Sequence, residues 1–113
     1  MSGYTVKKRK PFTRSSAEMV GQVSSVLAEL GGKATRVNNP DEGKLSYNFN
    51  KKVGKRAMGN RVQLDISVKT HQDDGSMVAI IGYPVDPLGN KLGFGVNGDP
   101  ARLVIDAVFS ELS

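Results

Sequence analysis

Two clusters of basic side chains are the residues whose types and spacing most directly predict a chemistry for this chain. One is a run near the N-terminus and the other lies in a glycine-containing segment: Lys7, Lys8, Arg9 and Lys10, and Lys51, Lys52, Lys55 and Arg56. Clustered positive charge favours polyanion partners such as nucleic acid or an anionic lipid surface. These residues are therefore the candidate polyanion-binding site. A basic tail that only promotes solubility is the competing interpretation.

The segment Gly93–Gly98 matches the pattern G-x-G-x-x-G of dinucleotide-binding folds. In those folds the glycines lie between a strand and a helix of a βαβ unit, where backbone amides contact a pyrophosphate. Too few residues follow Gly98 for such a unit to be completed. We interpret the segment as a turn-rich connection and expect no cofactor.

Side chains that could hold a metal or perform catalysis are sparse. His71 is the only histidine and there is no cysteine, so a transition-metal site is not expected. Asp73 and Asp74 follow His71 in a turn, where carboxylates are usually solvated. Ser15 and Ser16 have no base partner in the sequence and are explained as residues that begin a helix. We expect no catalytic residue and a protein that is not an enzyme.

Composition indicates one domain inside a cell. A chain of 113 residues can bury roughly two-thirds of the surface of its unfolded form. Its 16 Lys and Arg against 11 Asp and Glu give a net charge of +5. The absence of cysteine fits a reducing compartment. No apolar run reaches the roughly 20 residues of a membrane span, and the N-terminus lacks an apolar signal segment, so we expect a cytoplasmic protein.

Helical periodicity predicts one helix at about 15–30 and another at about 99–112. Ser15 and Glu18 form a capping box, apolar residues then recur at helical spacing, and Gly31-Gly32 end the run. Asp99 and Pro100 are typical of an N-cap and a first helical position.

Strand patterns predict an antiparallel sheet across about 33–96. Apolar and polar residues alternate over 44–50 and 61–69, and the turn formers Asp73-Asp74-Gly75 follow. The continuous apolar run at 77–83 indicates a central strand that is covered on more of its surface. We expect a long exposed hairpin loop at 51–60 and a short strand at 91–96.

These elements predict an α+β fold in the order α-β-β-β-β-α, with a four- to five-stranded antiparallel sheet. Each helix has one apolar face, so both should pack on the same side of the sheet. Residues 1–11 are expected to be a flexible basic arm and 12–113 a single domain. The polar face of strand 61–69 should stay exposed. The expected core unites residues from both helices and the sheet: Val23, Leu27, Leu30, Leu64, Ile66, Val104 and Val108.

Four segments together resemble the kinase-associated domain 1, whose relatives close the AMP-activated kinase alpha subunit. They are the start and end of the first helix, the alternating strand, and the closing helix: 12–20, 26–31, 62–68, and Gly98-Asp99 leading to 109–112. The resemblance implies binding of acidic phospholipids, or docking on a kinase or a regulatory protein. Only the basic segment at 51–56 is carried over as its candidate site.

Three functional hypotheses follow. A non-catalytic module that docks on an anionic phospholipid surface or a protein partner is favoured by the resemblance. A nucleic-acid-binding protein is favoured by the net charge of +5 and the basic arm. A structural protein that assembles into homo-oligomers through an exposed sheet edge is the third hypothesis.

Overall fold

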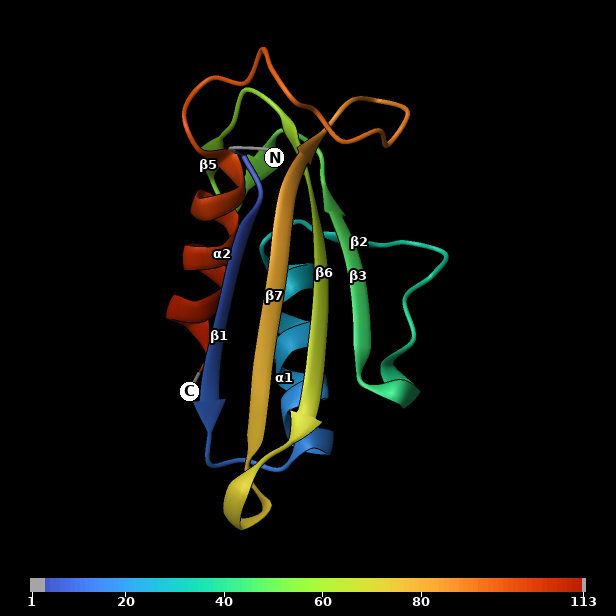
Figure 1. The fold of residues 1–113 in the computed structure, drawn as a ribbon, viewed down its shortest axis with the longest axis vertical. Coiled ribbons are helices and arrows are strands. Elements are labelled where there is room, and N and C mark those ends of the chain that lie inside the picture. The colour runs from blue at the N-terminus through green and yellow to red at the C-terminus, as the bar shows by residue number, and fades with distance from the viewer. Residues whose placement is uncertain (1–3, 113) are drawn as a thin grey trace.

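The computed structural model describes residues 4–112 and contains one five-stranded antiparallel sheet (Figure 1). The strand order is β1-β7-β6-β3-β2. The bounds of these strands are β1 Val6–Phe12, β2 Lys33–Ala34, β3 Lys44–Phe49, β6 Arg61–Thr70 and β7 Ser76–Val85. The remaining elements are α1 Ser16–Glu29, α2 Pro100–Glu111, the hairpin strands β4 Lys52–Val53 and β5 Arg56–Ala57, and the 3-10 turns η1 Pro40–Glu42 and η2 Gln72–Asp74.

Both helices pack on the same face of the sheet, which confirms the predicted α+β architecture (Figure 1). The opposite face, which we call the open face, is not covered by either helix. The molecule measures 43 × 28 × 25 Å, and its strands run along the longest axis. Among the described residues, no helix has the length and hydropathy of a membrane span.

Both helices begin and end close to the residues that the sequence predicts, and local hydrogen bonds cap their ends. The backbone N–H of Glu18 donates to Ser15 Oγ at 3.2 Å, and Ser15 Oγ donates to the Glu18 carboxylate at 3.2 Å. At the other end of α1, the N–H of Gly32 donates to the carbonyl of Leu27 at 2.8 Å. For α2, Asp99 accepts from the N–H of Arg102 at 3.3 Å, and Pro100 occupies the first turn.

The core lies between the helices and the sheet. In β6 the residues Val62, Leu64, Ile66 and Val68 are buried and alternate with more exposed neighbours, as the period-two pattern requires. The predicted core is confirmed, with Leu30 at its margin rather than fully buried. Its buried members are Val23, Leu27, Leu64, Ile66, Val104 and Val108.

The sheet differs from the expectation at both of its ends. Residues 6–11, for which the sequence indicates a flexible arm, form most of β1, which pairs with β7 over its whole length. The pairing gives hydrogen-bond partners to the backbone groups along one edge of β7. No local pattern in the sequence predicts this contact between distant segments. Residues 1–3 of the expected arm lie outside the described residues. At the other end the sheet stops at Val85, and 91–96 contributes only an isolated bridge between Val85 and Lys91.

Candidate anion-binding surfaces

Strand β1 divides the first basic cluster between the two faces of the sheet. Side chains alternate along a strand, so Lys7 and Arg9 lie on the open face while Lys8 and Lys10 lie on the helix side. The Lys8 ammonium forms an ion pair with Asp106 of α2. The Lys10 ammonium lies 5.7 Å from the centre of the Phe12 ring. The four consecutive cations therefore do not act as one patch.

The same cations protect an edge. β1 is the outermost strand, and unpaired edges invite pairing with another chain. Lysine-rich edges that contain proline resist this, and β1 carries Pro11 after its four cations. Two copies pairing through β1 would bring these charges together. This arrangement weighs against self-assembly through that edge.

The second basic cluster forms a compact structure, the basic hairpin (residues 51–56), instead of a long open loop. Strands β4 and β5 pair around Gly54 and Lys55. The N–H of Gly54 donates to the carbonyl of Leu30 at 2.7 Å, and Val53 is buried in the core. These contacts hold the hairpin against the end of α1. Its four cations are exposed, and within residues 4–112 none of them has a carboxylate in ion-pair range: Lys51, Lys52, Lys55 and Arg56.

The connection between β7 and α2, residues 86–98, presents two large apolar side chains to solvent. Leu88 is 87% exposed and Phe94 is 84% exposed. Asp86 shapes the first turn, because its Oδ1 accepts from the N–H groups of Leu88 and Asn90, both at 2.9 Å. These hydrogen bonds, those from Asn90 foremost, hold the pKa of the Asp86 carboxyl below its usual range. The G-x-G-x-x-G match lies in this connection, outside any βαβ unit.

The basic hairpin and the 86–98 connection lie at the same end of the long axis, at the top of Figure 1. Residues 56–59 and 97–100 line one shallow cavity of about 290 Å³ between them. We call this end the tip. It combines four exposed cations with two exposed apolar side chains, and neither feature is explained by packing within the described chain.

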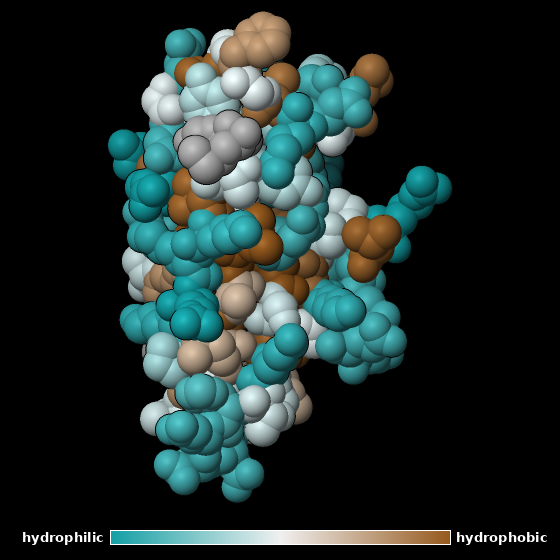
Figure 2. Space-filling view, viewed as in Figure 1, coloured by the Kyte–Doolittle hydropathy of each residue, from teal (hydrophilic) through white to brown (hydrophobic). Residues whose placement is uncertain are grey.

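The open face is a second cationic surface. The strand register places Lys7, Arg9, Lys33, Lys44 and Lys69 on it, all exposed. An apolar strip lies over β7 between its polar margins (Figure 2). Ile81 in this strip is 37% exposed, so β7 is central but uncovered on one side, contrary to the expectation from its apolar run.

A polar network crosses the open face beside that strip. Gln63 Nε2 donates to Ser46 Oγ at 2.8 Å and to Asp65 Oδ1 at 3.1 Å. The hydroxyl of Tyr83 donates to Asp65 Oδ2 at 3.0 Å. Burial, followed by the charge and hydrogen bond of Asp65, raises the pKa of Tyr83 to about 12. Both oxygens of this carboxylate are thus engaged.

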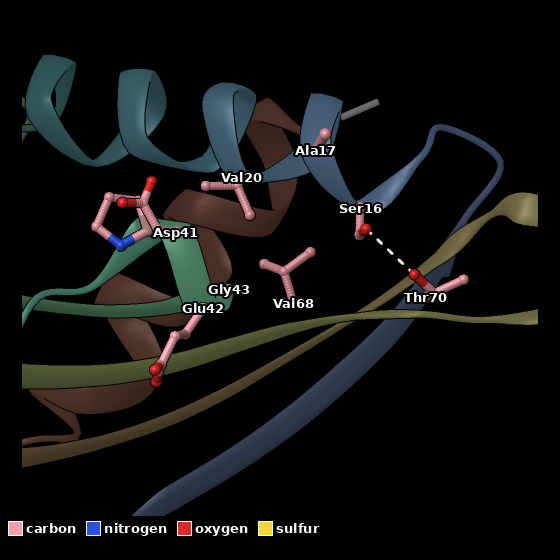
Figure 3. A pocket seen from close by; sticks show the side chains of 9 residues that line it. Ser16, Ala17, Val20, Asp41, Glu42, Gly43, Val68 and Thr70 are labelled. Carbon is pink, nitrogen blue, oxygen red and sulfur yellow. Dashed lines mark hydrogen bonds between the residues drawn. The ribbon is translucent and has the colours of Figure 1, made fainter.

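A hollow elsewhere on the molecule differs from the tip and the open face in the charge of the residues that line it. It lies between the start of α1 and η1, has a volume of about 540 Å³, and is shown in Figure 3. Ser16 and Thr70 are joined by a hydrogen bond of 3.2 Å at one side, while Asp41 and Glu42 line the other. Its described lining includes two carboxylates and no Lys, Arg or His, so it offers no counter-charge for a polyanion.

Metal-binding groups are not assembled anywhere in residues 4–112: no cluster of three His, Asp or Glu side chains could hold an ion there. His71 is exposed at the end of β6 beside η2.

Sequence reasoning missed the two apolar residues of the tip, Leu88 and Phe94. The signal in the sequence was a pair of isolated bulky residues in a stretch dominated by glycine and proline. It also missed Lys33 and Lys44, because their face depends on the pairing of β2 and β3.

No family model and no curated protein matches the sequence. Among solved structures, the crystal structure of Ara h 8.0201 is similar to this chain, with a TM-score of 0.56 and 8% sequence identity. The similarity covers 95% of this chain and 92% of that one. At this identity it shows a shared fold and nothing about function. The resemblance to the kinase-associated domain 1 stays a prediction.

Proposed function

We propose that this protein is a cytoplasmic, non-catalytic module that docks on anionic phospholipid surfaces through its tip. The observation that carries the proposal is the exposure of Leu88 (87%) and Phe94 (84%) at the same end of the molecule as the basic hairpin. Neither side chain is buried by packing within the described residues. A membrane interface accommodates both features, because headgroups attract the cations and the acyl boundary takes the apolar groups.

The free energy of membrane binding would have two contributions at the tip, one from its cations and one from its apolar side chains. A Lys or Arg near an anionic leaflet contributes about 1 kcal/mol, so the four hairpin cations contribute about 4 kcal/mol at most. A fully buried Leu or Phe side chain adds about 1.5–3 kcal/mol. Stable anchoring normally needs two signals, and the tip supplies both. The cytoplasmic leaflet carries the anionic lipids that such a surface requires.

Nucleic acid and a protein partner are the other candidate occupants of the tip. Nucleic acid would use the same cations but would leave Leu88 and Phe94 without an apolar counterpart. A kinase or regulatory partner, which the resemblance implies, could cover the apolar pair but gives no reason for four unpaired cations in one hairpin. Lipid accounts for both features together.

The test is sedimentation of the protein with vesicles of phosphatidylcholine alone or with added phosphatidylserine, at low and moderate salt. A tip-charge variant changes Lys51, Lys52, Lys55 and Arg56 to Ser, and a tip-apolar variant changes Leu88 and Phe94 to Ser. Two controls match them. An open-face variant changes Lys7, Arg9, Lys44 and Lys69 to Ser and removes the same charge. Val37→Ser removes another exposed apolar side chain, which is 75% exposed.

We expect the tip-charge variant to lose binding to phosphatidylserine vesicles. The tip-apolar variant should lose the part of the binding that persists at moderate salt, because salt screens only the charges. Val37→Ser should bind like the original protein, and the open-face variant should lose far less binding than the tip-charge variant. Equal losses in the open-face and tip-charge variants would mean that net charge alone drives binding, which contradicts docking by the tip. Failure to bind these vesicles even at low salt would overturn the proposal and leave nucleic acid or a protein partner as the occupant of the tip.

A further inference from the structure

The open face lies along the sheet, away from the tip, and its charge needs a separate explanation. Five exposed cations lie on it, and they have no ion-pair partner among the described residues: Lys7, Arg9, Lys33, Lys44 and Lys69. We infer that this face binds single-stranded nucleic acid, with phosphates along its cationic margins and bases over its centre. The inference does not depend on docking of the tip.

The strand register places the cations on opposite margins. Arg9, Ala79, Ser67 and Lys44 form one row across four neighbouring strands. Strands are about 4.8 Å apart, so Arg9 and Lys44 stand about 14 Å apart with small side chains between them. Lys7 extends one margin and Lys69 closes one end. A backbone of phosphates can follow either margin while its bases reach the centre.

The face offers almost no opposing negative charge. Asp65 is the one carboxylate that the register puts among the described residues of this face. Its two oxygens accept hydrogen bonds from Gln63 and from Tyr83. The five cations outnumber this single carboxylate, so the face as a whole is positively charged.

A hollow at the centre of the face has the size and lining for one base. It has a volume of about 400 Å³, and its lining combines the small side chains of Ser46, Ser67 and Ala79 with the apolar side chains of Ile81 and Val37. Lys44 and Asp65 also line it. The hydroxyl of Ser67 makes no hydrogen bond within residues 4–112, so it is available to the edge of a base. An apolar wall with few polar groups is typical of a site for a planar heterocycle.

An aromatic ring stands next to this hollow. Tyr83 lies on the same face as Gln63, its partner in the register, and the Lys91 ammonium is 4.8 Å from the centre of its ring. Stacking on an aromatic side chain beside cations is the recurring way in which proteins hold unpaired bases. A duplex would hide its bases from both the ring and the hollow. An acidic peptide would use the cations but neither of these two features.

The test measures fluorescence anisotropy of a labelled thymidine oligonucleotide, an abasic strand of the same length, a DNA duplex and polyglutamate. The open-face and tip-charge variants defined above are compared, since each removes four cations. Ala79→Leu fills the hollow without changing charge. Melting curves confirm that each variant is folded.

We expect the open-face variant to bind the oligonucleotide about tenfold or more weakly. The slope of log affinity against log salt should fall by about 0.7 for each phosphate that the variant no longer neutralises. The tip-charge variant should change the affinity far less. Ala79→Leu should weaken binding of the oligonucleotide about tenfold and leave the abasic strand unaffected, because stacked bases contribute at this scale.

Three results would overturn the inference. Equal losses in the two charge variants would show binding by net charge without a defined face. Equal affinity for the abasic strand and the oligonucleotide would exclude recognition of bases. Tighter binding of polyglutamate or of the duplex than of the oligonucleotide would assign the face to an acidic protein segment or to paired nucleic acid.

Discussion

The phenol of Tyr83 on β7 donates a hydrogen bond of 3.0 Å to Asp65 on β6, diagonally across the open face. Diagonal neighbours in an antiparallel pair are within reach of a long aromatic side chain. The contact positions the ring beside the hollow and holds the one carboxylate of this face among the described residues. It also makes the stability of the folded protein depend on alkaline pH.

The pKa of Tyr83, raised from 10.0 to about 12, makes the stability of the protein sensitive to base. Because the folded state holds the phenol proton more tightly than the unfolded state, the stabilisation is complete below pH 10 and is lost as pH rises through about 12. Ultraviolet titration should show a phenolate transition near pH 12 that is missing from Tyr83→Phe. In Asp65→Asn it should occur at lower pH, but still above the ordinary value because burial remains. A transition that does not move in Asp65→Asn would contradict this role of the carboxylate.

The turn at Asp86 should loosen in acid. Hydrogen bonds from Asn90 and Leu88 lower the pKa of this carboxyl from its ordinary 3.8, so the turn is favoured at neutral pH and weakens as pH falls through the lowered pKa. In an NMR titration the amide signals of Leu88 and Asn90 should shift together with the Asp86 carboxyl. In Asp86→Ala this common transition should be absent. The amide signals of Leu88 and Asn90 should then already have, at neutral pH, the positions that the original protein shows only in acid. Amide signals that titrate independently of Asp86 would show that it does not shape the turn.

Ile66→Ala should lower the free energy of unfolding by about 2–5 kcal/mol, as other cavity-forming core substitutions do. Ile66 is 3% exposed on the helix-facing side of β6. Val37→Ala is the control, since Val37 is 75% exposed and its truncation should change stability by no more than about 0.5 kcal/mol. Chemical denaturation measures both. Similar stabilities for the two variants would mean that the faces of β6 are assigned wrongly.

Gly43→Ala and Gly21→Ala should change stability in opposite directions. Gly43 has a φ of +71°, and an added Cβ would lie 2.4 Å from the carbonyl oxygen of Val68. Replacement there should cost at least about 1 kcal/mol. Gly21 lies within α1 with nothing within 4 Å of an added Cβ, so Ala should stabilise the helix by about 0.5–1 kcal/mol. Thermal melts of the two variants should bracket that of the original protein.

Local interactions explain which elements could be predicted from the chain alone. The bounds of α1 and α2 follow from caps between neighbouring residues, Ser15 with Glu18 and Asp99 with Arg102. The buried face of β6 follows from a period of two along one strand. The positive character of the basic hairpin follows from the clustering of its four cations in the sequence. None of these inferences needs knowledge of a distant partner.

Contacts between distant segments decided the rest. Lys8 is the register partner of Ile80 on the neighbouring strand β7, and its ammonium forms an ion pair with Asp106 on α2. A run of residues that looks like an arm in the sequence is therefore an edge strand, and its cations alternate between the two faces of the sheet. The exposure of Leu88 depends on where the 86–98 connection lies relative to the sheet, and no local pattern encodes that position. Strand pairing and burial are non-local, because each depends on which surfaces meet after the chain has folded.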